Sequence, residues 1–248
     1  MAKKLDDDLW DQACGHTESH LIAVDGLAGL YHGKMAADLQ ALMAAAQAQG
    51  FELAVASGYR SFERQLAIWQ AKASGVRPVL DSQGQPMVVD QLTDEELMWA
   101  ILRWSALPGA SRHHWGTDID VYDRAAVSAD YQLQLIPEEY EGQGPFARFS
   151  RWLGECIERQ QAFGFYRPYA EDRGGVAPEP WHLSYAPQAC HYQDLLTSER
   201  LLALWRQVDL PLLPQVEANI DEIVSRFILV PVMPFDTSAS DNGGGDRV

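Results

Sequence analysis

The chain has 248 residues, 47% of them hydrophobic, and a formal net charge of −16 from 19 Lys+Arg against 35 Asp+Glu. This length and apolar content suit a globular chain with a real core, and the acidic balance disfavours nucleic acid and anionic membrane surfaces as main partners. The cysteines Cys14, Cys156 and Cys190 form no close pair, so we expect free thiols in a reducing compartment.

The N-terminal residues carry no recognisable export signal. Two lysines are followed by Asp6, Asp7 and Asp8, where a secretory signal would place its apolar region. The most apolar late segment, 227–235, is too short to span a bilayer and contains Pro231 and Pro234. The sequence therefore favours the cytoplasm over the periplasm.

The first third of the chain predicts a helix, a strand and a second helix. After an irregular opening, residues 34–49 place Leu39 and Leu42 on one apolar stripe, which indicates a helix. Residues 51–57 alternate like a strand, and Ser61 can cap a helix that runs to about residue 73. Residues 78–90 then predict two short extended pieces around a turn, an insert with no chemistry of its own.

The middle of the chain leads into a strand with two different faces. Thr93 and Glu96 have capping-box spacing, so a helix should begin there and must end by Pro108. From Gly116 onward, apolar residues alternate with Asp118 and Asp120. This pattern predicts a strand with one apolar face and one carboxylate face, which should meet a site or solvent.

The last third predicts mainly helices. We expect helices over 146–163, 188–208 and 215–227, a strand over 181–185, and a mobile Gly-, Ser- and Asp-rich tail over 236–248. The whole pattern favours a single α+β domain over residues 1–235, in which a small, mostly antiparallel sheet carries the site and helices pack on its other face.

Two short clusters contain the residue types that bind a catalytic zinc ion. His113 and Asp120 lie on either side of a glycine, and Glu179 precedes His182 by three residues. A catalytic zinc needs three protein ligands, one open position for water and a nearby base. These four residues could fill those roles.

Strand geometry limits how these residues can meet. His113 and Asp120 are an odd number of residues apart, so a straight strand would point them to opposite faces, and the chain must bend near Gly116. Pro180 pushes Glu179 into an extended conformation, which excludes a helical Glu-x-x-His arrangement. Asp118 should lie on the same side of the strand as Asp120.

A third stretch, Ser57-Gly58-Tyr59-Arg60-Ser61, completes a known pattern. The chain resembles the zinc D-alanyl-D-alanine carboxypeptidases and dipeptidases that include the vancomycin-resistance enzymes and share a fold with the hedgehog signalling domain. Their pattern is Ser-Gly-Tyr-Arg-Ser, then Ser-x-His-x-x-Gly-x-x-x-Asp, then Glu-x-x-His followed by a strand. All three blocks occur here in this order, and the resemblance spans roughly residues 50–185.

The resemblance implies a role for each matching residue. The zinc (Zn2+) ligands would be His113, Asp120 and His182. Glu179 would be the base that deprotonates water and later protonates the leaving amine, and Arg60 would face the scissile carbonyl, where a guanidinium stabilises developing negative charge.

Other residues near these blocks have weaker assignments. Three are candidates for substrate contacts or for holding Arg60: Ser57, Tyr59 and Gln65. We expect His114 to be a packed or exposed histidine. Three aromatic residues could line a substrate cleft, although aromatic residues near strand ends more often belong to the core: Trp115, Trp181 and Tyr185.

One position departs from the family pattern, because family members commonly carry a small residue where this chain has Asp118. An extra carboxylate here could orient a ligand histidine, bind a substrate ammonium group or face solvent. We expect the solvent-facing arrangement.

The resemblance implies hydrolysis of a peptide bond in peptidoglycan-derived or precursor peptides, with a D-alanyl-D-alanine carboxypeptidase as the favoured activity. The alternatives are a lysin-like L-alanyl-D-glutamate endopeptidase and a non-catalytic zinc-containing binding module. The strong negative charge disfavours a lysin that must adhere to a polyanionic wall. The presence of Glu179 and Arg60 ranks the non-catalytic module last.

Overall fold

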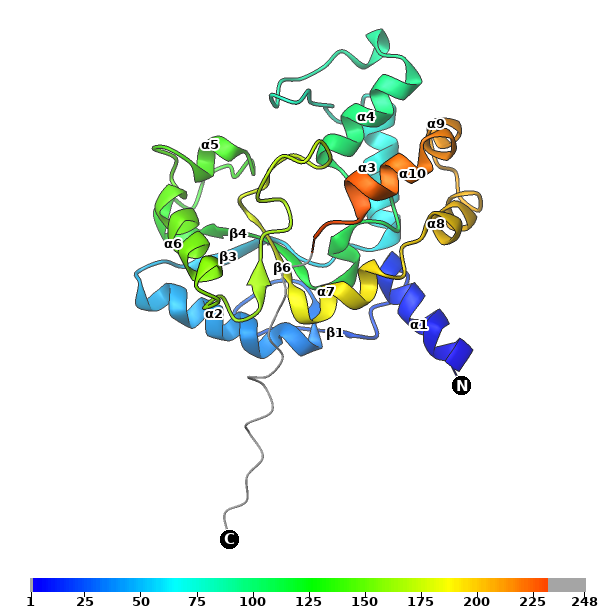
Figure 1. The fold of residues 1–248 in the computed structure, drawn as a ribbon. Helices are drawn as coiled ribbons and strands as arrows, with labels where there is room; N and C mark the ends of the chain where they lie inside the picture. Colours follow the sequence, from blue (N-terminus) through cyan, green and yellow to red (C-terminus); the bar gives the residue numbers. More distant parts are fainter. Residues whose placement is uncertain (1, 232–248) are drawn as a thin grey trace.

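A four-stranded antiparallel sheet lies at the centre of the molecule (Figure 1). The computed structural model describes residues 2–231, so the predicted tail over 236–248 lies outside the described residues. Within them the strands follow the order β3 (Leu53–Ser57), β4 (Asp118–Asp123), β6 (His182–Tyr185) and β5 (Phe165–Tyr166). A separate ribbon pairs β1 (Leu21–Ile22) with β2 (Tyr31–His32).

Helices surround this sheet, which confirms the predicted α+β class. They are α1 (Ala2–Cys14), α2 (Ala36–Ala48), α3 (Phe62–Ala73), α4 (Asp94–Trp104), α5 (Pro137–Tyr140), α6 (Ala147–Glu158), α7 (Ala186–Gln193), α8 (Ser198–Trp205), α9 (Leu213–Ala218) and α10 (Ile220–Ile223). No helix among the described residues is both long and apolar enough to cross a bilayer.

One face of the sheet is buried against α2 and α6. Leu39 of α2 and Phe149 of α6 belong to the same buried cluster as Ile119, Val121 and Leu183 of the central strands. Because side chains alternate along a strand, this packing directs Asp118 and Asp120 of β4 to the opposite face. The apolar face of β4 therefore fixes where its carboxylates point.

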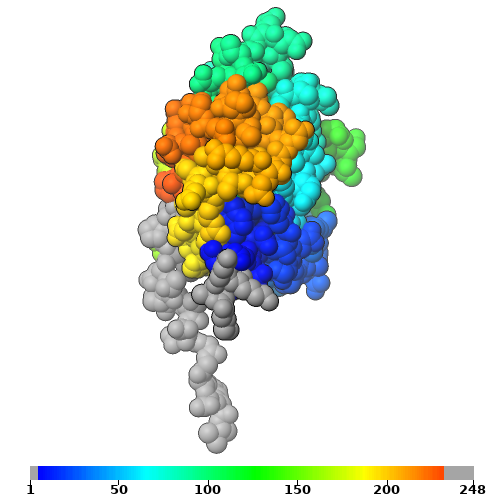
Figure 2. All heavy atoms as spheres, turned by 90° about the vertical axis from the view of Figure 1, so that its right-hand side faces the viewer, coloured from blue at the N-terminus to red at the C-terminus, as the bar shows by residue number. Residues whose placement is uncertain are grey.

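A second buried cluster joins α3 and α4 to α1 and the C-terminal helices. It includes Trp69 of α3, Ile101 of α4 and Trp205 of α8. Figure 1 shows these helices grouped away from α2 and α6, and Figure 2 shows the C-terminal helices (orange) and the N-terminal segment (blue) covering one side of the molecule. This cluster includes Leu107 and Trp115 and therefore supports the loop between α4 and β4, which carries His113.

The structure corrects three expectations about helices. The opening is helix α1 and not irregular, because Leu9, Trp10, Ala13 and Cys14 pack against the second cluster. The helix expected over 188–208 is divided into α7 and α8. The division occurs because the Leu196 side chain is buried, at 2% exposure, and because Thr197 caps α8 by accepting from the Arg200 amide. The helix expected over 215–227 is likewise broken into α9, α10 and a π-helical turn, Val224–Ile228.

Candidate metal centre

The chain bends at Gly116, as predicted. Arg112–Trp115 form one 3-10 turn, which ends at Gly116 in the left-handed conformation with φ +68°. A Cβ atom there would lie 2.3 Å from Leu21 Cδ2 and 3.1 Å from the His32 backbone nitrogen, so both conformation and space favour glycine. The bend places His113, before it, and Asp120, after it, on one side of the sheet.

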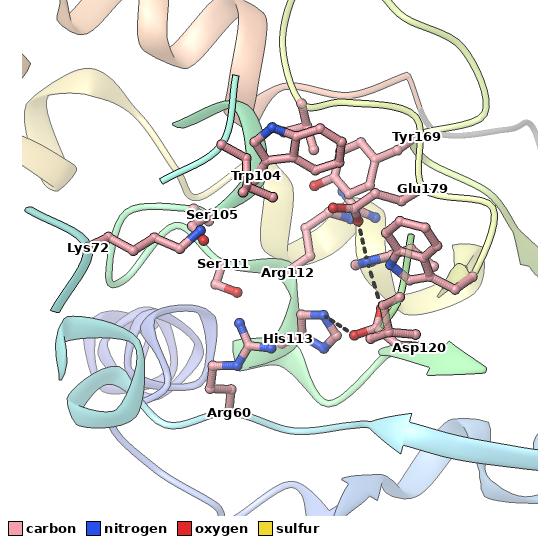
Figure 3. Close-up of a pocket in the computed structure, with 16 residues that line it drawn as sticks. Arg60, Lys72, Trp104, Ser105, Ser111, Arg112, His113, Asp120, Tyr169 and Glu179 are labelled. Atoms are coloured by element: carbon pink, nitrogen blue, oxygen red, sulfur yellow. Dashed lines mark ion pairs between the residues drawn. The ribbon is translucent and has the colours of Figure 1, made fainter. Parts of the chain in front are cut away.

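Three side chains converge at this face, and Figure 3 shows two of them, His113 and Asp120, pointing toward one another. His113 Nε2 lies 3.5 Å from Asp120 Oδ2, and His182 Nδ1 lies 3.3 Å from Asp120 Oδ1. One potential ligand atom from each residue lies within 4.8 Å of the others. All three residues are buried, and they come from the 3-10 turn, from β4 and from β6.

The donor atoms of this cluster fit a zinc ion. Asp120 Oδ1 is buried and has no hydrogen-bond partner among the described residues, a state that costs free energy unless a cation or water occupies the space. His113 Nδ1 lies 2.9 Å from the Gly58 carbonyl oxygen, which can only accept, so Nε2 is left with a lone pair. Two imidazole nitrogens and a carboxylate are an ordinary zinc ligand set with an open position.

Glu179 lies beside these ligands. Its Oε2 is 3.2 Å from His182 Nδ1, and its side chain is 14% exposed. Burial raises the pKa of Glu179, although His182 opposes this effect. Pro180 follows, and the His182 amide donates to the Glu179 carbonyl, so a tight turn and not a helix brings the two side chains together. A carboxylate with a raised pKa next to the ligand set can accept and return a proton.

Asp118 is buried, which corrects the expectation that it faces solvent. It is 0% exposed and lies on the same side of β4 as Asp120, as predicted, with Oδ1 3.0 Å from His182 Nε2. Burial alone would raise its pKa, but Arg112 and His182 lower the pKa of Asp118 to about 2. The expectation failed because Arg112, six residues earlier, folds back over this face and forms an ion pair with Asp118 at 2.8 Å.

Arg60 reaches the same space from the loop after β3. Its Nη1 donates to Gln65 Oε1 at 2.8 Å, and its Nη2 donates to Ser57 Oγ at 3.1 Å. Burial lowers the pKa of Arg60, while Asp120 and Glu179 favour its charged form. Of the two roles foreseen for Ser57 and Gln65, the contacts favour holding Arg60. Tyr59 instead donates to the Gly15 carbonyl at 3.2 Å, and direct substrate contact by these three residues stays a prediction.

A cavity of about 270 Å³ lies in front of the three candidate metal ligands. The predicted residues that line it are Arg60, His113, Asp120, Glu179, Trp181 and His182. Trp115 is buried in the apolar cluster around α3 and α4, and Tyr185 is buried in the apolar cluster around α2 and α6. His114 is a packed, fully buried histidine.

Some lining residues were not found from the sequence, among them Lys72, Ser105 and Tyr169. Figure 3 shows Lys72 and Ser111 pointing toward the same space as Arg60. Lys72 follows Gln65 by seven residues, so both share one face of α3. That spacing is the signal that could have identified Lys72.

Two histidines and an aspartate around one point, a largely buried carboxylate beside them and an arginine lining the same cavity define the class: a metal-dependent hydrolase centre. The comparisons with known proteins identify the family. Residues 30–188 match the family model described as VanY, D-alanyl-D-alanine carboxypeptidase, and the chain belongs to this family.

Several individual proteins are similar to the chain. An uncharacterised protein of Haemophilus influenzae is 32% identical over 125 residues, which cover 50% of this chain and 93% of that protein. A D-alanyl-D-alanine carboxypeptidase of Enterococcus faecalis is 32% identical over 170 residues, 66% of this chain and 52% of the relative. The chain therefore spans about half the length of that carboxypeptidase.

Two solved structures are also similar to this chain. VanYB in complex with D-alanine-D-alanine is 27% identical, with a TM-score of 0.48 and coverage of 74% of this chain and 87% of that chain. A zinc-bound mutant of a VanY D,D-pentapeptidase is 26% identical, with a TM-score of 0.46 and coverage of 75% and 92%.

Proposed function

We propose that this chain is a zinc-dependent D,D-carboxypeptidase that releases the terminal D-alanine from peptidoglycan-type peptides. The observation that carries the proposal is the position of Glu179, whose carboxylate lies beside the ligand cluster and lines the cavity. The family match supports the substrate class. A binding module that keeps the metal would need neither Glu179 nor Arg60 beside the three candidate ligands.

Each side chain has a defined part in this reaction. Zinc held by His113, Asp120 and His182 would supply Lewis acidity and lower the pKa of a water molecule. Glu179 accepts a proton from the attacking water and returns it to the leaving amine, which suits a carboxylate whose pKa is raised by burial. Arg60, held by Gln65 and Ser57, faces the oxygen that gains negative charge.

The position of Lys72 in the cavity supports exopeptidase activity over endopeptidase activity. It lines the cavity on the side opposite Glu179 (Figure 3), and its ammonium forms no ion pair with any residue between 2 and 231. A cation without a protein partner is available to a substrate carboxylate. We infer that Lys72 binds the terminal carboxylate, the group that distinguishes the end of a peptide from its middle.

The substitution Glu179→Gln tests the mechanism. The amide keeps the shape of the side chain but cannot accept a proton, so we expect kcat to fall about 10²–10⁴-fold while the zinc content stays at the wild-type value. Glu171→Gln is the matched control, because Glu171 is an exposed carboxylate on the same loop and is not among the residues that line this cavity. Wild-type turnover by the Glu179 variant would refute the assigned base.

Product analysis separates the favoured activity from its alternatives. A defined pentapeptide ending in D-alanyl-D-alanine should lose one D-alanine, as measured by mass spectrometry. Cleavage between L-alanine and D-glutamate would instead identify a lysin-like endopeptidase. A binding module would hydrolyse nothing across a panel of D-amino-acid peptides, even when fully loaded with zinc.

We also infer a cytoplasmic role on precursor or recycled peptides. The net charge of −16 supports it, because a polyanionic wall would repel the chain. Cell fractionation that finds the native protein in the periplasm would overturn this location.

A further inference from the structure

His182 lies between two carboxylates of the same strand. Asp120 Oδ1 lies 3.3 Å from its Nδ1, and Asp118 Oδ1 lies 3.0 Å from its Nε2. The two ring nitrogens therefore face different partners, and only one of them faces the metal site. The carboxylates themselves also differ in what surrounds them.

The carboxylate of Asp118 has no free lone pair for a metal ion or a further hydrogen-bond donor. Its Oδ1 accepts from Arg112 Nε at 2.8 Å and from His182 Nε2, while its Oδ2 accepts from Thr117 Oγ1 at 2.7 Å and from Ser184 Oγ at 3.1 Å. A carboxylate offers about four lone-pair sites, and at 0% exposure no substrate can reach it. Asp118 is therefore neither a metal ligand nor a contact for a substrate ammonium group.

We propose that Asp118 is the positioning residue for the zinc ligand His182. By accepting the Nε2 proton, it fixes the ring orientation and leaves the Nδ1 lone pair directed at the ligand cluster. His113 is held in a different way, by the neutral carbonyl of Gly58. The partner of His182 is therefore a charged carboxylate, whereas the partner of His113 is a neutral carbonyl.

Arg112 in turn holds Asp118. Its guanidinium donates to Tyr166 of β5 at 2.9 Å, Ser184 of β6 at 2.7 Å and Gln193 of α7 at 3.0 Å. It also lies over the Trp115 ring, 4.5 Å from the centroid. Every one of these contacts is internal to the protein, so the orientation of His182 depends on β5, β6 and α7 as well as on β4.

The proposal rests on the proposed zinc site but not on the peptidase activity, so zinc binding tests it. Asp118→Asn removes the charge and leaves Arg112 buried without a carboxylate, which alone can destabilise the fold. The double variant Asp118→Asn/Arg112→Gln removes both charges. Asp123→Asn is the matched control, because Asp123 is a buried carboxylate on the same strand that accepts from the Glu52 and Ala125 amides.

Zinc affinity is measured by competition with a chromophoric chelator. We expect the double variant to bind zinc roughly 10–100-fold more weakly than the wild type, while the Asp123 variant binds zinc normally. If Asp118 only neutralised Arg112, the double variant would recover wild-type affinity. A loss below about fivefold in a folded double variant, well short of the usual effect of removing such a partner, overturns the proposal.

A second measurement needs no variant. In the zinc-loaded wild type, long-range ¹⁵N–¹H spectra should show a proton on His182 Nε2 that exchanges slowly with solvent, because a buried carboxylate accepts it. A proton on Nδ1 instead would overturn the proposal even if the variants did not fold. A wild-type chain that binds no zinc would refute the proposed function, whereas one that binds zinc but cleaves no peptide would leave this test intact.

Discussion

Gln65 offers a direct test of how the fold positions Arg60. Its side chain is 0% exposed and connects two groups. Its Oε1 accepts from Arg60 Nη1 at 2.8 Å, and its Nε2 donates to the Ala106 carbonyl at 2.6 Å. Gln65→Met keeps the length of the side chain and removes both hydrogen bonds. The substitution should therefore affect stability and catalysis together.

The magnitude follows from the groups left behind. An unsatisfied buried polar group costs about 1–3 kcal/mol, and two groups lose their partner. Arg60 and Ala106 are only partly buried, so water can replace some of the loss, and we expect the free energy of unfolding to fall by about 2 kcal/mol. Arg60 keeps its bond to Ser57, so kcat should fall about tenfold, less than the 10²–10³ expected when a charge-stabilising donor is removed outright.

Urea unfolding of the metal-free protein and steady-state kinetics measure the two effects separately. Gln70→Met is the matched control, because Gln70 lies on the same helix and donates to the Asp209 carbonyl, away from Arg60. It should leave kcat unchanged. If Gln65→Met kept wild-type kcat while Arg60→Ala lost activity, Gln65 would not be the residue that positions the guanidinium.

Two further predictions concern the cavity and the bend. Lys72→Met should raise KM about 10–100-fold with little change in kcat, because it removes a charge-assisted hydrogen bond worth about 1.5–3 kcal/mol. Burial lowers the pKa of Lys72 to about 8, so the wild-type ammonium loses its proton as the pH rises through that value, and KM should increase between pH 7 and 9 in the wild type but not in the variant. Gly116→Ala should lower the free energy of unfolding by about 1–3 kcal/mol, through the left-handed backbone and the contact with His32. Gly142 also has a positive φ, +55°, but open space where a Cβ would lie, so Gly142→Ala should show only the backbone cost in urea unfolding. Equal losses of stability in the two variants would contradict a steric contribution at Gly116.

The sequence was informative where local spacing limits geometry. The odd separation of His113 and Asp120 required a bend, and Gly116 was the residue able to make it. The even separation of Asp118 and Asp120 placed both carboxylates on one face of β4. These conclusions follow from the repeat of a strand and the conformational freedom of glycine, which act within a few residues.

The environment of Asp118 could not be predicted in the same way. Whether a strand face meets solvent depends on which segments cover it, and here the cover is Arg112 with partners from β5, β6 and α7. The break at Leu196 has a similar cause, because burial of that side chain overrides a continuous helical pattern. Lys72 was missed because a lysine on an amphipathic helix ordinarily lies in solvent.

The metal cluster depends on the register of one pair of strands. Asp120 lies opposite His182 and Asp118 opposite Ser184, so the diagonal placement of His182 between the two carboxylates exists in this register alone. A slip by one residue would turn both carboxylates toward the core and Ile119 toward the cavity. Ile119 is fully buried in the cluster formed with α2 and α6, and this burial opposes the slip. The apolar face of β4 therefore determines the geometry of the site on its other face.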